Sequence, residues 1–166
     1  KRRILGAGFW PRARSVSELN PIRLFVSHLY APDEAYSRVF EYLESAINFF
    51  YKNYATPDKP PRSKEREALK EDLRRQISEA EVVILLSTLH ERDPVLIEFQ
   101  ALYAKASDKP VIVMEPFGTG KPVAKELLEL ADVVIGWNGR EMADKIRQQA
   151  RHEDTTRWDV IEFKLD

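Results

Sequence analysis

The chain contains no cysteine among its 166 residues. This absence excludes disulfide bonds, thiolate zinc sites, iron–sulfur clusters and cysteine nucleophiles, and it suits a reducing compartment. We therefore expect a cytoplasmic protein. Long apolar runs are also lacking: stretches such as Val82–Leu86 fall far short of the roughly 20 residues that a membrane-spanning helix needs. We expect no membrane partner.

An excess of charge of one sign is missing as well. The 26 basic residues nearly balance the 27 acidic ones, so the surface field of a nucleic-acid-binding protein is absent and we expect no nucleic-acid partner. The remaining composition, 43% hydrophobic and 32% charged, is typical of one globular domain. Residues 1–21 include several basic side chains but no signal-peptide apolar core, so we expect a linker or a trimmed end there.

Motifs for common cofactors do not occur. Gly118–Lys121 lacks the upstream glycine and the following Ser or Thr of a phosphate-binding loop, and it is predicted to be a turn. No GxGxxG follows the first apolar run and no GxSxG elbow is present. The three histidines, His28, His90 and His152, show no metal-ligand spacing. We therefore expect neither a metal nor a resident cofactor.

Short apolar runs alternate with amphipathic segments from Ile22 onward, which is the pattern of βα units around a parallel sheet. The expected strands are Ile22–Val26, Asn48–Tyr54, Val82–Leu86, Val111–Met114 and Asp132–Gly136. The expected helices cover about 34–47, 63–77, 94–107, 122–130 and 141–150. This order predicts an α/β domain over 22–151 with the flavodoxin-like three-layer sandwich, built on a five-stranded, mostly parallel sheet. Residues 152–166 are expected to be an extension packed on or beside the domain.

Two local signals refine this prediction. Asp93-Pro94 is typical of a helix start, because Asp caps free N–H groups and Pro suits the first turn. The helix that follows is expected to turn Val95, Phe99, Leu102 and Ala106 toward the core. Thr56–Pro61, with three prolines, is predicted to be an exposed loop.

Ligands of open parallel sheets bind beyond the carboxyl ends of the strands. The residues at those ends are therefore the first candidates for a functional site. They are Ser27-His28, Asn53-Tyr54, Ser87-Thr88, Glu115 and Trp137-Asn138.

Several of these segments resemble a known family. The sequences Leu24–His28, Phe50–Pro57, Leu73–Ser78, Val82–Leu86, Tyr103–Pro110 and Ile135–Asn138 together resemble bacterial TIR-like domains, in particular the TIR-like proteins of the Thoeris antiphage system. The likeness covers about 22–151 and depends on several weak motifs in the right order.

The resemblance implies an enzyme that takes NAD as its substrate. Such a domain cleaves the nicotinamide–ribose bond and releases ADP-ribose or a cyclic form as a signal in antiphage defence. It also implies self-association through TIR–TIR contacts and a downstream effector protein that senses the product. A carboxylate beside the sugar fits this chemistry, because the ribose becomes positively charged as the bond breaks.

The family places its catalytic glutamate nine residues before the lysine of the Lys-Pro that opens the fourth strand. Counting back from Lys109 reaches Gln100, so the chain departs from the family pattern at this position. Glutamine has the shape of glutamate without its charge, and we expect impaired turnover. Glu98 is the alternative catalytic residue if the register is shifted by two, or else an ordinary solvated residue.

The same resemblance suggests the residues that contact NAD. Ser27 and His28 are expected to line the cleft, and Tyr30 or Tyr54 to stack on a ring of the dinucleotide. The strand-end residues Asn53 and Ser87 complete the expected binding set. For each of them a purely structural role, in a cap or a turn, is an open alternative.

Other functions stay open at this point. A TIR-like interaction module without chemistry agrees with Gln100. A nucleoside deoxyribosyltransferase-like enzyme would use a similar sheet and a glutamate to release a free base from a nucleoside. A flavodoxin-like electron carrier is disfavoured, because residues 27–32 lack the hydroxyl side chains that a flavin phosphate prefers.

Overall fold

The structure, a computed structural model, describes residues 16–152. Nearly all of the expected C-terminal extension over 152–166 and most of the expected N-terminal linker over 1–21 lie outside the described residues. Every strand pair in the sheet is parallel, and the strand order is β2-β1-β3-β4-β5. The strands are Ile22–Val26 (β1), Tyr51–Asn53 (β2), Val82–Leu86 (β3), Val111–Met114 (β4) and Val133–Ile135 (β5). The flavodoxin-like fold class is thereby confirmed.

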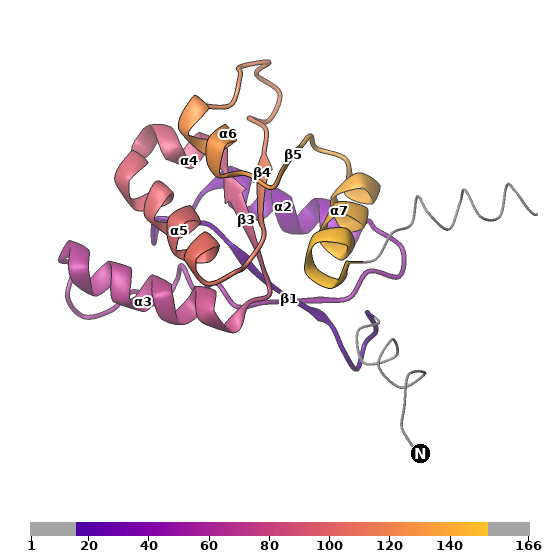
Figure 1. Ribbon diagram of the computed structural model, residues 1–166, viewed down its shortest axis with the longest axis horizontal. Coiled ribbons are helices and arrows are strands. Elements are labelled where there is room, and N and C mark those ends of the chain that lie inside the picture. The colour runs from indigo at the N-terminus through magenta and orange to yellow at the C-terminus, as the bar shows by residue number, and fades with distance from the viewer. Residues whose placement is uncertain (1–15, 153–166) are drawn as a thin grey trace, which may run out of the picture.

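Helices cover both faces of this sheet (Figure 1). They are Glu34–Glu44 (α2), Arg66–Glu79 (α3), Ser87–Arg92 (α4), Pro94–Ala106 (α5), Lys125–Leu130 (α6) and Gly139–Arg151 (α7). Contacts between α2 and α7 form one layer, and contacts of α5 with α3, α4 and α6 form the other. None of the helices within 16–152 is long and apolar enough to cross a membrane.

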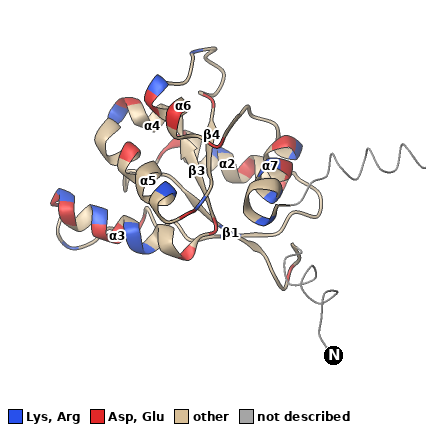
Figure 2. Ribbon diagram, in the orientation of Figure 1, with Lys and Arg blue, Asp and Glu red and all other residues tan. Residues whose placement is uncertain are grey.

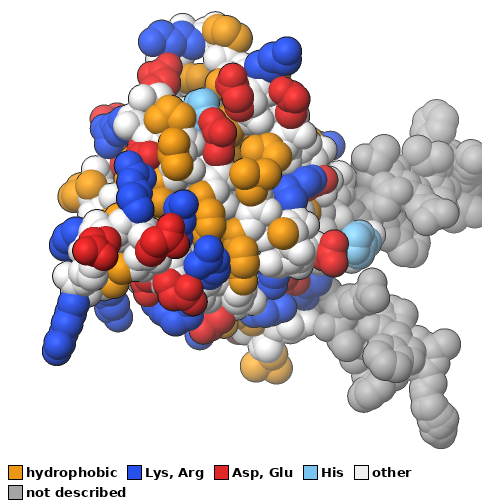
Figure 3. All heavy atoms as spheres, turned by 60° about the vertical axis from the view of Figure 1, so that its left-hand side comes forward, with side chains coloured by type: hydrophobic (Ala, Val, Ile, Leu, Met, Phe, Trp, Pro, Cys, Tyr) orange, Lys and Arg blue, Asp and Glu red, His pale blue; other side chains and the backbone are white. Residues whose placement is uncertain are grey.

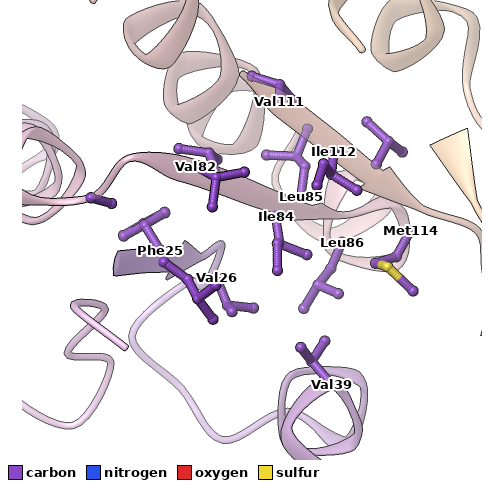
Figure 4. Close-up of a cluster of buried hydrophobic side chains, with 14 of the residues drawn as sticks. Phe25, Val26, Val39, Val82, Ile84, Leu85, Leu86, Val111, Ile112 and Met114 are labelled. Carbon is purple, nitrogen blue, oxygen red and sulfur yellow. The ribbon is translucent and has the colours of Figure 1, made fainter. Parts of the chain in front are cut away.

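The core lies against the two central strands. Every residue of β3 and of β4 is buried, as expected for strands covered on both faces. Figure 4 shows Ile84 and Leu86 pointing toward Val39 of α2, with Leu85 on the opposite side of β3. The side chains of the uninterrupted apolar run of β3 therefore face both helical layers.

Side-chain caps set the starts of three helices. Asp93 accepts a hydrogen bond from the Leu96 N–H at 3.1 Å, as the Asp-Pro signal predicts. Asp33 caps α2 in the same way through the Tyr36 N–H at 3.0 Å. Asn138 caps α7. These caps bring the N-termini of α2, α5 and α7 to the carboxyl edge of the sheet.

Three details differ from the sequence-based expectation. The second strand is shorter, Tyr51–Asn53 instead of 48–54. Helix α2 ends at Glu44, which leaves Ile47 84% exposed. Helix α4 was not expected, because no turn residue separates it from β3.

The expected core face of α5 is wrong. Val95 and Leu102 are 62% and 54% exposed, whereas the buried face carries Leu96, Ile97, Gln100, Ala101 and Ala104. This helix is apolar almost all round, so its periodicity offers two faces. The small side chains of the two buried alanines let this face approach the sheet.

Candidate functional site

Gln100 lies on the buried side of α5, under the loop that follows β1. Its Oε1 accepts from the His28 N–H at 3.3 Å, and its Nε2 donates to the His28 carbonyl at 2.9 Å. The side chain is fully buried. A carboxamide matches a peptide group in this way because it both donates and accepts, whereas a carboxylate only accepts. Gln100, which the family pattern places at the catalytic position, therefore holds the loop after β1 with its side chain buried.

His28 is buried and held by hydrogen bonds at both ring nitrogens. Nδ1 accepts from the Tyr30 N–H at 3.2 Å, which leaves Nε2 to carry the proton toward Gln76 Oε1 at 2.9 Å. Burial lowers the pKa of His28 to about 4, despite the hydrogen bond that the ring donates to Gln76. The ring is thus neutral at pH 7 and structural in this arrangement.

Gln76 of α3 joins the loops that follow β1 and β2. Its Oε1 also accepts from the Thr56 N–H at 2.9 Å, and its Nε2 donates to Asp72 at 2.8 Å. The Tyr30 hydroxyl donates to the same carboxylate at 2.7 Å. Burial first, and this hydrogen bond second, raise the pKa of Tyr30. The Tyr30 hydroxyl is therefore engaged within the protein.

The network gives a testable pH dependence. The pKa of His28 is lowered from 6.5 to about 4 in the folded chain, so the unfolded chain binds a proton more readily. The stability that comes from the neutral, buried ring is therefore complete above the pKa of the unfolded chain and is lost as the pH falls toward the pKa of the folded chain. We expect the free energy of unfolding to fall by about 3 kcal/mol between pH 7 and pH 4. Urea unfolding across this range measures it. His28→Asn should flatten the curve, while the exposed-site control His152→Asn should keep it; a flat curve for the unaltered chain contradicts the account.

Two serines at strand ends also form hydrogen bonds within the protein. Ser27 Oγ accepts from the Leu86 N–H at 2.8 Å, which ties the end of β1 to that of β3. Ser87 Oγ donates to the Met114 carbonyl at 2.7 Å, which ties β3 to β4. Both side chains are buried. Their hydroxyl groups therefore link the ends of neighbouring strands at the carboxyl edge of the sheet.

At the end of β2, one candidate side chain, Asn53, is engaged within the protein and the next, Tyr54, is more accessible. Asn53 donates to the Tyr36 hydroxyl at 2.8 Å and accepts from the Ala55 N–H at 3.0 Å, an arrangement typical of a turn. Tyr54 is partly exposed, and Lys52 Nζ lies 5.1 Å from its ring centre. Of these two candidates, Tyr54 retains a ring that a ligand can contact.

Glu98 has the surroundings that Gln100 lacks. Its carboxylate lies 2.6 Å from His90 Nε2, and its side chain is 33% exposed beside a nearly buried imidazole. The pair joins the consecutive helices α4 and α5 just beyond the end of β3. Sequence reasoning considered Glu98 but missed His90, because nothing in its spacing signals a partner eight residues away across an unexpected helix.

A cavity of about 450 Å³ occurs at the opposite, amino edge of the sheet. Its lysines are already engaged: Lys105 pairs with Asp132 at 2.9 Å, and Lys109 donates to the carbonyls of Ser78 and Ala80. Across residues 16–152, no group of three or more His, Asp or Glu side chains is arranged to hold a metal. We place the candidate site at the carboxyl edge instead, because ligands of open parallel sheets bind there and because this edge carries the Glu98–His90 pair.

The sheet and its helices define a flavodoxin-like α/β domain, and the candidate site lies beyond the carboxyl ends of its strands. A family model described as the TIR-like domain of the Thoeris protein ThsB matches residues 25–121, more than half of the chain. The chain belongs to this TIR-like family of the Thoeris antiphage system. The search of curated proteins finds no match.

Proposed function

We propose that the domain binds NAD at the carboxyl edge of its sheet and cleaves the nicotinamide–ribose bond. Membership of the Thoeris TIR-like family supports the substrate. The single observation that carries the catalytic part is the Glu98–His90 pair, which combines a partly exposed carboxylate with a fixed imidazole partner. We further propose that the product, ADP-ribose or a cyclic form, signals to an effector protein.

The chemistry requires one negative charge near the sugar. As the C–N bond breaks, its electron pair leaves with nicotinamide, and C1′ of the ribose becomes positively charged. Glu98 would stabilise this charge and accept hydrogen bonds from the ribose hydroxyls. A water molecule, or a nitrogen of the adenine in a cyclisation, then forms the new bond to C1′, and a proton is released. His90 is a positioning residue that holds the carboxylate.

Gln100 has a supporting part in this proposal. It fixes the His28 peptide group in the loop that follows β1 at this edge of the sheet. Tyr54 offers a partly exposed ring for stacking. We assign Ser27, Asn53 and Ser87 to the framework of the site, because their polar atoms are engaged within the protein.

Product analysis tests the proposal. Purified protein is incubated with NAD, alone and with a lysate of phage-infected cells that is heated to inactivate its enzymes and filtered. We expect nicotinamide and ADP-ribose, or its cyclic form, in equal amounts. A parallel incubation with a deoxynucleoside tests the deoxyribosyltransferase alternative, which predicts a free base there. No nicotinamide under either condition would overturn the proposal.

A second candidate function, a non-catalytic self-associating module, is favoured by the outer face of α5. Val95, Phe99, Leu102 and Ala106 follow the four-three-four spacing of a helix-pairing seam. Figure 3, which brings α3, α4 and α5 forward, shows hydrophobic side chains gathered between charged ones. A helix that is apolar all round normally has both faces covered.

A second copy of the chain fits this face. If two α5 helices pack antiparallel across a two-fold axis, Phe99 lies opposite the partner's Leu102, and Val95 opposite the partner's small Ala106. Glu98 and Lys105, which contact His90 and Asp132 within the chain, lie two turns apart on one flank, so the same arrangement sets Glu98 of one copy beside the partner's Lys105. The seam and its charges are therefore self-complementary.

Sedimentation velocity measures this association. Leu102→Glu should weaken it at least tenfold, because it places a charge in the middle of the seam. The matched control is Ile47→Glu, since Ile47 is a large apolar side chain that is exposed elsewhere, and this change should have no effect. A monomer at all concentrations up to the millimolar range, or equal loss in both variants, contradicts self-association through α5.

A further inference from the structure

Two ion pairs cross the carboxyl edge of the sheet. Arg66 of α3 contacts Asp93 at the start of α5 at 2.7 Å, and Arg92 at the end of α4 contacts Asp33 at the start of α2 at 3.5 Å. Because Arg92 and Asp93 are consecutive, the two pairs form one belt. The belt runs from α3, over the α4–α5 corner, to α2.

The position of this belt follows from the topology. Helices α3 and α5 cover one face of the sheet and α2 covers the other, as the two sides of Figure 1 show. The Arg92–Asp33 pair therefore passes from one helical layer to the other, beyond the ends of β1 and β3. The α4–α5 corner from which the belt extends also carries the His90–Glu98 pair.

Both arginines can leave their partners at little cost. The Arg66 and Arg92 side chains are 54% and 59% exposed, and ion pairs this exposed contribute little to stability. Each aspartate divides its two oxygens. Asp93 caps α5 through Oδ1 and contacts Arg66 through Oδ2, while Asp33 caps α2 through Oδ2 and contacts Arg92 through Oδ1. A released arginine therefore leaves both helix caps intact.

We propose that Arg66 and Arg92 exchange these aspartates for the diphosphate of a bound dinucleotide. The guanidinium fork matches two phosphate oxygens at once, which favours a phosphate over the single carboxylate oxygen that each arginine now contacts. This inference rests on the proposed function and adds the two residues that bind the diphosphate of its substrate, a group that a free nucleoside lacks. The two arginines are binding residues, outside the bond-breaking step.

Figure 2 shows why a bound anion needs specific partners here. Basic and acidic residues alternate over the helices, and no helix of the described chain is coloured by one sign alone. A general attraction for anions is therefore small. Binding of a diphosphate depends on particular guanidinium groups that are able to turn toward it, and Arg66 and Arg92 flank the corner that carries Glu98.

Isothermal titration with ADP-ribose tests the inference, because it needs no turnover. Arg66→Gln and Arg92→Gln should each weaken ADP-ribose binding about tenfold. The matched control is Arg23→Gln: this arginine is 47% exposed and pairs with Glu81 at the opposite edge of the sheet, and its loss should change nothing. Inorganic pyrophosphate, as a second probe, should compete with ADP-ribose in the unaltered chain and less so in the two variants.

Nicotinamide release from NAD on the same proteins separates the two proposals. If the unaltered chain releases nicotinamide and both variants keep its KM and its ADP-ribose affinity, the arginine inference is overturned and the proposed function stands. If ADP-ribose binds through both arginines but no nicotinamide is released, the proposed function fails alone. Absence of ADP-ribose binding to the unaltered chain, or equal weakening in Arg23→Gln, overturns the inference directly.

Discussion

Changing Glu98 to glutamine will lower nicotinamide release by about 10²- to 10³-fold, the usual effect of removing one group that stabilises transition-state charge. The side chain keeps its length and its contact with His90, so the substitution removes the negative charge with little change of shape. We expect kcat to fall with little change in KM, because the interaction is strongest when the ribose is positively charged. Steady-state kinetics with NAD measure both constants.

The control for this prediction is Glu91→Gln, which removes the same single negative charge from an exposed position on the neighbouring helix α4. It should leave kcat within about twofold, since exposed charges interact weakly through water. Equal activity of Glu98→Gln and the unaltered chain would remove Glu98 from the mechanism. Equal loss in both variants would point to a general effect of charge.

Changing Gln100 to glutamate will destabilise the domain instead of activating it. The fully buried carboxylate would face the His28 carbonyl, to which Gln100 now donates. Losing that donor and burying a charge should cost about 3 kcal/mol. For a chain of this length the loss corresponds to a fall in Tm of about 10 °C. Calorimetry at pH 7 measures it, with Gln148→Glu on the partly exposed side of α7 as control.

The pH dependence of this variant has a definite sign. Burial and the facing carbonyl would raise the folded-state pKa of a glutamate at position 100 above its unfolded value. The protonated acid is able to donate to the His28 carbonyl, so the variant should approach the unaltered chain at low pH and lose stability as the pH rises through the folded pKa. A variant as stable as the unaltered chain at pH 7 would show that the Gln100 amide is dispensable.

The sheet was predictable because each central strand is a short apolar run with polar residues or proline at its ends. Val82–Leu86 and Val111–Met114 have the expected bounds, and the start of α5 at Asp93-Pro94 follows from local capping chemistry. These features depend on neighbouring residues alone. Helix α4 escaped prediction for the same reason: no local break separates Ser87 from the strand before it.

The side-chain partners at the candidate site were less predictable. Gln100 contacts a peptide group 72 residues earlier, and His28 contacts Gln76 across 48 residues. Spacing along the chain carries no information on such contacts. Counting along the sequence therefore gave two candidate positions on one helix, but it did not show that Gln100 is buried and Glu98 partly exposed.

The prediction of the buried face of α5 was wrong for a different reason. Apolar residues occupy both of its sides, and hydrophobic periodicity alone does not rank two apolar faces. The sheet contacts the face with Ala101 and Ala104, while Val95 and Leu102 stay exposed. The same ambiguity concealed the burial of Gln100, which lies in the face toward the sheet and not among the residues expected to face the core.

One assay tests the central claim that the working carboxylate is at position 98 and that Gln100 is part of the framework. It compares initial rates of nicotinamide release from NAD for the unaltered chain, Glu98→Gln and Gln100→Glu, each at a temperature where the protein is fully folded. The account predicts activity in the unaltered chain, its loss in Glu98→Gln and no gain in Gln100→Glu. A large gain in Gln100→Glu, with Glu98→Gln equal to the unaltered chain, would contradict it.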